Sequence, residues 1–416
     1  KDRLSQFPDG SRGGGSETRV GSTMRCRGRG DGPGIKRFQT FFHRLWALSN
    51  LMSSAKTRVL FTIGSMSGGG AERQTLNYLR HLDRKRYEPV LYLHYRRGEY
   101  LALVPEDVPV IAFWDRHRPP HIRLPGRIFW WQVRDLAQVL AAERIDVVCS
   151  VTFLATLVAF GAIQRRPTPW IAVEMADPRL DFAHQVKRFR SLKRRLLARA
   201  YRRADFAVAV SEGVREGMQE TYRLCIEHAA VIRNFIDLAE IDRLARQPGP
   251  GPAPGRFHVV NVGRLDKQKG QIHLLQAMSD LVHRRARREV HLSILGQGPL
   301  EQDLKSFVRE EKLDEYVSFV GFLSNPFAFV ARCQLFCLPS IYEGLPLALL
   351  EGMACRIPVL AADCPSGPRE VLAEGRFGRL VPAGSSAPLA DAIEDAIDHY
   401  QDWLAAVVPA REHIER

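Results

Sequence analysis

The sequence has no apolar run of the about 18 residues that a transmembrane helix requires. Its apolar patch at residues 41–52 is short and is interrupted by His43, Arg44 and Asn50. The N-terminal segment also lacks the apolar stretch, directly after a short charged start, that marks a signal peptide. We therefore expect neither a membrane-spanning nor a secreted protein.

Cysteine is scattered, and the seven cysteines include no Cys-x-x-Cys pair. Cys333 and Cys337 lie in or beside an apolar segment, where we expect them to pack in a core. Free buried thiols are typical of a reducing compartment such as the cytoplasm. A disulfide-stabilised secreted domain is therefore not expected.

Motifs for metal-dependent and nucleophilic catalysis are also missing. The sequence has no Asp-x-Asp, no cluster of His, Cys and Asp with metal-ligand spacing, and no evident Ser/His/Asp or Cys/His arrangement. We therefore expect no metal site. Any charge that develops on a phosphorylated ligand would have to be stabilised by cationic side chains instead.

Positive charge is abundant. The 416 residues include 60 Lys and Arg against 46 Asp and Glu, a formal net charge of +14 and a pI of about 9.7. This balance indicates attraction to polyanions, whether nucleic acid, anionic lipid or phosphorylated substrates.

The chain divides into five segments by composition. Residues 1–55 are glycine-rich, basic and without hydrophobic period, which predicts a disordered extension or upstream sequence from an overlong gene model, with Met52 as a candidate start. Alternating strand and helix patterns then predict one domain over 56–245 and a second over 257–400. A Pro/Gly-rich linker separates them at 246–256, and residues 401–416 begin a C-terminal helical tail.

The first domain opens with a strand at 58–63, a glycine-rich loop and a helix at 71–82, as a Rossmann-like domain does. The loop fits neither Gly-x-Gly-x-x-Gly nor Gly-Lys-Ser/Thr spacing. Gly69 and Gly70 would let the backbone approach a ligand closely, and a tight structural turn is the alternative. Further elements are expected at 88–94, 108–113, 132–142, 147–150, 170–173 and 204–210.

The second domain repeats the strand–helix alternation. Strands are expected at 257–262, 290–295, 317–322, 334–339 and 358–361, with helices through 281 and at 300–311, 326–331 and 389–404. Glycines and cations follow the first two strands: Gly263, Arg264 and Lys269 after one, Gly296 and Gly298 after the other. The predicted fold class is α/β, with two Rossmann-like domains that face each other across a cleft.

The segment 340–354 has the pattern of a sharp loop followed by a helix. Pro346 suits the first turn of that helix, which places Glu343 just before its N-terminus and Glu351 about 7 Å along its axis. Free N–H groups and the helix dipole make such an end a seat for a phosphate. The alternative is a capped core helix with two surface glutamates.

Arg264 and Lys269 follow a strand whose carboxyl end lies at the edge where α/β sheets bind ligands. A lone Arg and Lys in a loop are usually surface charges. Because they converge with the helix end after Glu343 on the same edge, we favour a diphosphate site there.

One helix, over residues 186–203, is almost wholly cationic on one side. Apolar residues recur at helical spacing, and the segment from Lys187 to Arg203 contains no acid. This pattern favours a helix that lies on an anionic membrane surface, over a solvated face or a nucleic-acid site.

These motifs together resemble those of family 4 retaining glycosyltransferases of the GT-B fold. The resemblance runs from about residue 58 to the end and is carried by Glu343-x7-Glu351, by Gly263-Arg264 with Lys269-Gly270, and by the segment 68–73, Gly-Gly-Gly-Ala-Glu-Arg. Two segments, 174–178 and 363–370, resemble the bacterial branch that adds hexoses or N-acetylhexosamines to polysaccharide, lipopolysaccharide and other lipid-linked acceptors.

The resemblance implies a transferase that uses a UDP- or GDP-sugar, retains the anomeric configuration and needs no metal or other cofactor. It implies that Arg264 and Lys269 bind the diphosphate, that Glu351 binds the ribose, and that Glu343 with the backbone of its loop binds the sugar. The expected donor-binding residues are Gly69, Gly70, Gly263, Arg264, Lys269, Gly296, Gly298, Glu343, Gly344, Leu345 and Glu351, with Glu343, Arg264 and Lys269 as catalytic candidates.

Two features depart from the family pattern. Many members have a His after the strand at 170–173, where this sequence has Glu174, Met175 and Asp177. Members also usually end in a helix that crosses back to the first domain, and this sequence stops at Arg416, before or within it.

We therefore expect a glycosyltransferase at the cytoplasmic face of a membrane, with a lipid-linked or polysaccharide acceptor and no nucleic-acid partner. Another GT-B enzyme, such as a nucleotide-sugar epimerase, is the first alternative. A basic, non-enzymatic binder of lipid or nucleic acid is the second.

Overall fold

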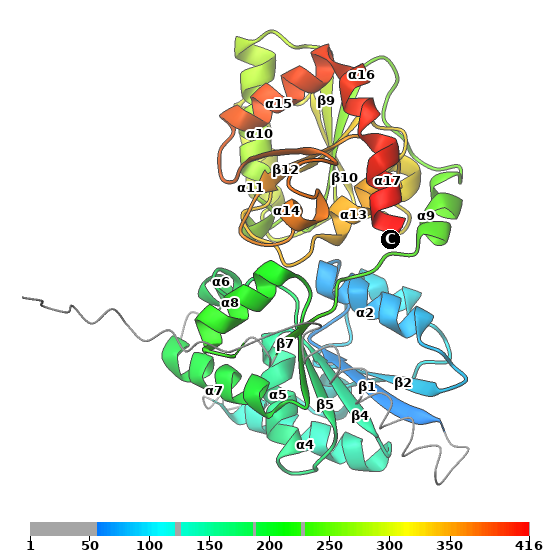
Figure 1. Ribbon diagram of the computed structural model, residues 1–416, viewed down its shortest axis with the longest axis vertical. Coiled ribbons are helices and arrows are strands. Elements are labelled where there is room, and N and C mark those ends of the chain that lie inside the picture. The colour runs from blue at the N-terminus through cyan, green and yellow to red at the C-terminus, as the bar shows by residue number, and fades with distance from the viewer. Residues whose placement is uncertain (1–55, 121–125, 186–188, 226–228, 416) are drawn as a thin grey trace, which may run out of the picture.

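The computed structural model describes residues 56–120, 126–185, 189–225 and 229–415. The predicted N-terminal extension, with Met52, lies outside these residues, as does Lys187 of the basic segment. Figure 1 shows two α/β domains, one above the other, with the helices arranged around a sheet in each.

The first domain is built on a seven-stranded parallel sheet of order β3-β2-β1-β4-β5-β6-β7. The strands are β1 (Thr57–Ile63), β2 (Tyr87–Leu93), β3 (Val110–Ala112), β4 (Val147–Val151), β5 (Trp170–Glu174), β6 (Phe206–Ala209) and β7 (Ala229–Val231). They are buried apolar runs, as expected of parallel strands that are covered on both faces. The helices and turns between them are α2 (Gly70–His81), η1 (Glu99–Leu103), α3 (Phe113–Arg116), α4 (Arg127–Ala142), α5 (Phe153–Ile163), α6 (Asp181–Gln185), α7 (Arg190–Arg203) and α8 (Glu212–Tyr222).

The second domain has a six-stranded parallel sheet of order β10-β9-β8-β11-β12-β13. The strands are β8 (Phe257–Val262), β9 (Val290–Leu295), β10 (Val317–Gly321), β11 (Leu335–Leu338), β12 (Val359–Asp363) and β13 (Arg379–Pro382). Its helical elements are η3 (Lys267–Lys269), α10 (Gln271–Ser279), η4 (Asp280–Arg284), α11 (Glu301–Glu310), α12 (Phe327–Val330), α13 (Leu347–Ala354), α14 (Pro368–Val371), α15 (Ala387–Asp398), α16 (Tyr400–Ala405) and α17 (Val407–Glu415). The predicted fold class, two Rossmann-like domains, is confirmed.

Several elements differ from the sequence prediction. Helix α5 was not predicted because it is apolar all round and packs between α4 and α7, so it has no amphipathic period. Strand β13 was also missed. The helix predicted at 389–404 is divided at His399 into α15 and α16, and α10 ends in the π-helical turn η4. Pro346 has an extended backbone and precedes α13, where we had predicted it inside the first turn.

One helix next to the domain boundary in sequence packs on the second domain. Helix α9 (Leu238–Ala245) follows the first domain in sequence and packs on α12 and α13 of the second. Helix α17 joins it, since Arg411 donates to Ala354 O at 2.8 Å and pairs with Asp242 of α9 at 2.8 Å. The division at 246–256 stays a prediction. This segment has no helix or strand and leads from α9 to β8.

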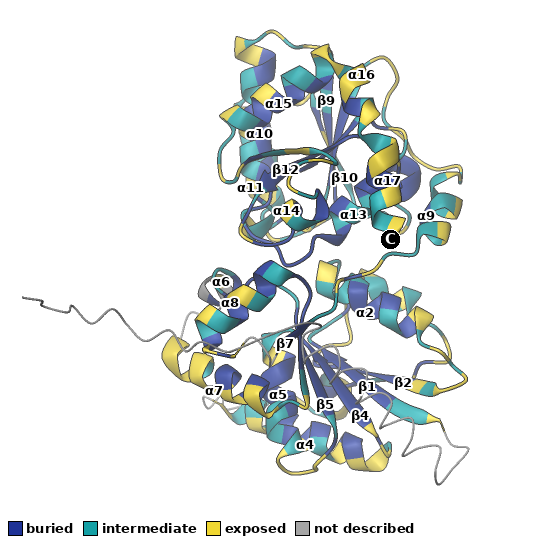
Figure 2. Cartoon of the chain, in the orientation of Figure 1, coloured by how far each residue is buried: buried dark blue, intermediate teal, exposed yellow. Residues whose placement is uncertain are grey.

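Figure 2 shows that both sheets are buried, while α7 carries much exposed surface. Among the described residues, no helix combines the length and the apolar character of a membrane span. One hydrophobic cluster covers the first domain and continues into the second, where it includes Phe336 of β11 and Val359 of β12. The second cluster lies wholly in the second domain and includes the alternate residues Leu335 and Leu360, on the other face of the same sheet.

Candidate functional site

The cavity between the domains lies where strands of both sheets end. It has a volume of about 360 Å³ and is lined by residues that directly follow β1, β4, β5 and β8, together with the loop before α13. Nine of the eleven predicted donor-binding residues line it: Gly69, Gly70, Gly263, Arg264, Lys269, Glu343, Gly344, Leu345 and Glu351. The expectation that ligand chemistry gathers at the carboxyl ends of parallel strands agrees with this placement.

The second domain supplies the cations of the cavity. Arg264 follows β8, and its guanidinium pairs with Asp266 at 2.5 Å. Asp266 in turn caps the short helix η3 by accepting from the N–H of Lys269 at 3.2 Å. The loop thus presents two cations on one turn, which suits them to bind neighbouring phosphates.

Glu343 is buried, with 5% of its surface exposed, and both partners of its carboxylate belong to the second domain. Lys269 Nζ lies 2.6 Å from Glu343 Oε1, and Ser340 Oγ donates to the same oxygen at 2.7 Å. A buried carboxylate needs such partners because the loss of hydration is costly. The carboxylate is therefore held in one orientation at the cavity wall.

Glu351 forms an ion pair across the cleft that we did not predict. Its carboxylate lies 3.3 Å from Nε of Arg73 on α2, and both side chains are about 15% exposed or less. Burial raises the pKa of Glu351, and the Arg73 charge opposes that rise. The Arg73 guanidinium also lies over the rings of Tyr100 and Phe327, 5.6 and 5.4 Å from their centroids. Arg73 belongs to the motif at 68–73, which was the available signal.

The glycine loop of the first domain forms the opposite wall. Gly69 is the N-cap of α2, with no side chain to cap that helix, and Gly70 begins it. A Cβ at Gly69 would lie 2.4 Å from the Glu72 carboxylate, so the lack of a side chain lets Glu72 fold back onto the loop. Burial raises the pKa of Glu72 to about 7, whereas Arg264 across the cleft acts to lower it.

Gly296 and Gly298 lie farther from the main cavity. Gly296 lines a smaller neighbouring pocket of about 60 Å³, together with Arg73, Gly263 and Glu351. A Cβ at Gly296 would lie 2.1 Å from Gly263 O, and one at Gly298 would lie 2.3 Å from Leu265 O. Both glycines thus let the loop after β9 pack against the loop after β8, and Gly298 lines neither pocket.

Glu174 and Asp177 have different surroundings. Glu174 accepts hydrogen bonds from Tyr201 at 2.8 Å and Tyr222 at 3.3 Å, and burial raises its pKa to about 8. Asp177 is fully buried and accepts from Ser366 of the second domain at 2.6 Å. Glu174 lines the cavity, while Asp177 joins the two segments that suggested the bacterial branch.

No group of three or more His, Cys, Asp or Glu side chains within the described residues is arranged to hold a metal ion.

Comparisons with known proteins agree with this architecture. A family model described as "Glycosyltransferase Family 4" matches residues 68–240, and one described as "Glycosyl transferases group 1" matches residues 256–399. HepE from Anabaena, crystallised with UDP-glucose, superposes with a TM-score of 0.70 at 24% identity, covering 86% of this chain and 94% of that one.

Two curated bacterial relatives match over part of their length. One is N-acetylgalactosamine-N,N'-diacetylbacillosaminyl-diphospho-undecaprenol 4-alpha-N-acetylgalactosaminyltransferase of Campylobacter jejuni, 32% identical over 45% of this chain and 49% of the relative. The other is lipopolysaccharide 1,6-galactosyltransferase of Salmonella typhimurium, 28% identical over 51% and 55%. The matches to these curated relatives thus span about half of their length. The two family models and the fold agree, and the chain belongs to the family 4 glycosyltransferases of the GT-B fold.

Proposed function

We propose that this protein transfers a hexose or N-acetylhexosamine from a nucleotide-sugar to a lipid-linked or polysaccharide acceptor, with retention of configuration. The observation that carries the proposal is the convergence, in one interdomain cavity, of two cations, a buried carboxylate and a glycine loop. Relatives named as N-acetylgalactosaminyl- and galactosyltransferases support the sugar class, and a structural neighbour in complex with UDP-glucose motivates a uridine diphosphate donor.

The residues suggest how the bond to the leaving diphosphate breaks. Arg264 and Lys269 would stabilise the negative charge that develops on that diphosphate, which is the task that a metal performs in other enzymes. The acceptor oxygen bonds to the anomeric carbon on the face that the diphosphate leaves, and the acceptor proton passes to the departing phosphate. Glu343 accepts hydrogen bonds from the donor sugar, and Glu351 from the ribose.

A panel of UDP- and GDP-sugars tests the donor. A ligand that binds only the folded protein raises the melting temperature, so a matching nucleotide-sugar will do so and an unrelated nucleotide will not. With an undecaprenyl-diphosphate-linked sugar as acceptor, we expect an α-linked product and undiminished activity in EDTA. Epimerisation of the donor without acceptor would favour the alternative enzyme class, and no shift with any donor would contradict the proposal.

We also propose that helix α7 places the protein on the anionic inner face of the membrane. Leu192 is 56% exposed and Leu196 is 36% exposed, and Phe189 just before the helix is 70% exposed. The cations of the helix are Arg190, Lys193, Arg194, Arg195, Arg199, Arg202 and Arg203. Exposed apolar side chains among cations match the boundary between acyl chains and acidic headgroups.

Vesicle sedimentation tests this docking surface. The double variant Phe189→Ser/Leu192→Ser should bind phosphatidylglycerol vesicles at least about tenfold more weakly than the parent, since each side chain buries apolar area. Val408→Ser is the matched control, because Val408 is 65% exposed on α17 of the other domain. Equal binding by both variants, or equal binding to phosphatidylcholine, would contradict the membrane assignment.

A further inference from the structure

The loop that carries Glu343 is held by the first domain through three successive backbone carbonyls. Each carbonyl accepts a hydrogen bond from a different first-domain residue. The three bonds, from donor to acceptor, are Asp177 N–H to Glu343 O at 3.0 Å, Ser211 Oγ to Gly344 O at 2.9 Å, and Asn234 Nδ2 to Leu345 O at 3.0 Å. The second-domain loop therefore takes its shape from contacts made by the opposite domain.

The donors come from three separate places on the first sheet. Asp177 follows β5, Ser211 is the N-cap of α8 after β6, and Asn234 follows β7. Asp177 and Ser211 are fully buried and Asn234 is 7% exposed, so water does not compete for these carbonyls. A buried carbonyl that loses its donor keeps the cost of desolvation, so removal of any one of these donors disfavours the docked shape of the loop.

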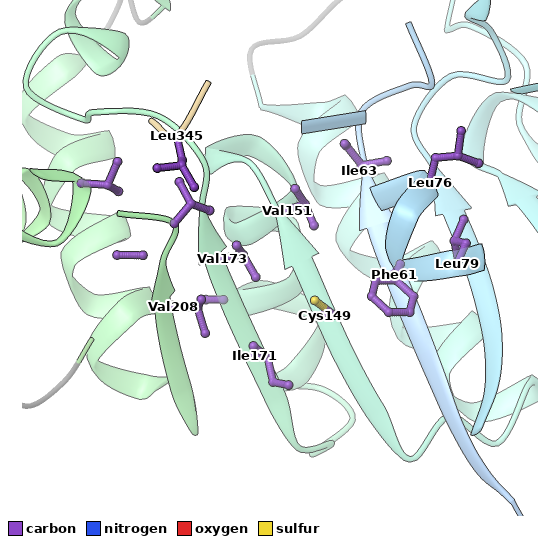
Figure 3. Packing of buried hydrophobic residues seen from close by; sticks show 14 of the residues in the cluster. Phe61, Ile63, Leu76, Leu79, Cys149, Val151, Ile171, Val173, Val208 and Leu345 are labelled. Atoms are coloured by element: carbon purple, nitrogen blue, oxygen red, sulfur yellow. The ribbon is translucent and has the colours of Figure 1, made fainter. Parts of the chain in front are cut away.

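The fit at Gly344 is steric as well as polar. Gly344 forms an antiparallel bridge with Ala176, and a Cβ at position 344 would lie 2.0 Å from Met175 O. Leu345 is buried in the same hydrophobic cluster as the first-domain core and lies beyond the ends of the strands that carry Val173 and Val208 (Figure 3). The loop is thus docked on the first domain on both sides of Gly344.

This docking fixes the direction of a backbone N–H, that of Gly344, which can donate a hydrogen bond to the ligand. In a trans peptide the C=O and the following N–H point in opposite directions. Because Asp177 holds the carbonyl of Glu343, the N–H of Gly344 is directed away from the first-domain backbone. Glu343 and Gly344 both line the cavity, so rotation of this peptide would change what the cavity presents to a sugar.

We infer that Asn234 and Ser211 are positioning residues for sugar transfer, which act through the loop Glu343–Leu345 and not on the substrate. The loop has its donor-binding shape only while the first domain holds its carbonyls, so the sugar site depends on contacts from both domains. This inference rests on the proposed function. It predicts that the nucleotide binds without these contacts, because Arg264 and Lys269, the cations proposed to bind its diphosphate, lie in the second domain. Turnover, by contrast, requires the contacts.

The test separates turnover from nucleotide binding. Asn234→Ala and Ser211→Ala are compared with the parent for kcat and KM of UDP release from UDP-glucose, or from the nucleotide-sugar that the panel selects, and for UDP affinity by calorimetry. We expect kcat to fall about 10- to 100-fold, the cost of losing a buried hydrogen bond, with UDP affinity unchanged.

Asn77→Ala is the matched control. Asn77 is 8% exposed, and its Nδ2 donates to Phe235 O at 3.1 Å, a contact of the same type that does not touch the loop. This variant should keep the parent kcat. Melting temperatures of all three variants exclude loss of folding as the cause.

Three outcomes would overturn the inference. They are an unchanged kcat in Asn234→Ala and Ser211→Ala, an equal fall in UDP affinity and kcat, or an equal fall in Asn77→Ala. If the parent protein binds UDP-sugars and turns them over, and the Asn234 and Ser211 variants do the same, only the positioning role is contradicted. If the parent protein neither binds nor turns over any nucleotide-sugar, the proposed function is contradicted as well.

Discussion

The two domains contribute to the cavity in different ways. The second domain supplies charged side chains in fixed pairs, such as Lys269 with Glu343 and Arg264 with Asp266. The first domain lines the cavity with its glycine loop and with the carboxyl side chains of Glu72, Glu174 and Asp181, and its one cation there, among the described residues, is Arg73. Its neutral donors Ser211 and Asn234 hold the second-domain loop that carries Glu343. The second domain is therefore suited to bind the ligand and the first to set the geometry of the groups that bind it.

This difference also explains where the hydrophobic clusters lie. The cluster of the first domain extends through Leu345 and Leu349 into the second domain, whereas the rest of the second domain has a core of its own. The wall that faces the ligand is thus packed jointly by both domains. A change in the first domain is expected to alter turnover through that wall without touching the ligand.

The largest expected effect is in the second domain. Glu343→Gln removes the charge that pairs with Lys269 at 2.6 Å, and we expect transfer to fall about 10²- to 10³-fold, as for the loss of one preorganised group. Nucleotide affinity should remain, because Arg264 and Glu351 are unchanged. Steady-state transfer and calorimetry with UDP measure the two effects.

Glu301→Gln is the control for this variant. It breaks a pair of the same length, Lys305 Nζ to Glu301 Oε1 at 2.6 Å, on the surface of α11. Transfer should be unaffected. If Glu343→Gln lost nucleotide affinity as strongly as turnover, the separation of sugar and nucleotide contacts in the second domain would be wrong.

The comparison also shows what the sequence can predict. Strands β8 and β9 are confirmed at the predicted bounds, and nine predicted residues meet in one cavity. The strands and the shared location of these residues could be predicted because the carboxyl end of each strand is a local property of parallel α/β units, whereas donor binding by these residues stays a prediction.

The contacts between domains could not be predicted in this way. Nothing local to Asn234 or Ser211 shows that each will donate to a carbonyl more than 100 positions away. The Arg73–Glu351 pair likewise depends on how α2 meets α13, which is decided by packing of the whole fold. Gly344 is predicted from the resemblance as a donor-binding residue, but nothing in the sequence shows that Met175 O of the first domain leaves no room for a side chain there.

The intermediate effect concerns the ion pair in the cavity between Arg73 of the first domain and Glu351 of the second. Arg73→Ala leaves the Glu351 carboxylate buried without its partner, and we expect the free energy of unfolding to fall by about 3 kcal/mol. The pKa of Glu351 is already raised by burial, and it will rise further without Arg73. The variant should therefore regain melting temperature as pH is lowered and the carboxyl becomes neutral.

Arg243→Ala is the control, since Arg243 pairs with Glu240 at 2.7 Å on the surface, where water screens the charges and such pairs contribute little to stability. Chemical denaturation at several pH values measures both variants. A loss in Arg73→Ala no larger than in Arg243→Ala would show that the domains do not depend on this pair.

The smallest expected effect on turnover lies in the first domain. Burial raises the pKa of Glu174 from 4.5 to about 8, so the folded protein holds this proton more tightly than the unfolded chain. The stability it contributes is fully present below about pH 4.5 and is lost as pH rises through about 8. Glu174→Gln accepts from Tyr201 and Tyr222 without titrating, so its melting temperature should fall less than that of the parent over this range, by a few degrees (about 2–4 °C).

Thermal melts from pH 5 to pH 9, beside Glu220→Gln on the exposed side of α8, measure this difference. We expect Glu174→Gln to change transfer at pH 7 little, because Tyr201 and Tyr222 already hold the Glu174 carboxyl in place. In the division described above, the first domain positions the groups that bind the ligand and takes no part in the chemistry. A hundredfold loss of transfer in Glu174→Gln would contradict that division. It would place an acid–base group for the acceptor hydroxyl in the first domain, at the end of β5, and the domains would then share the chemistry.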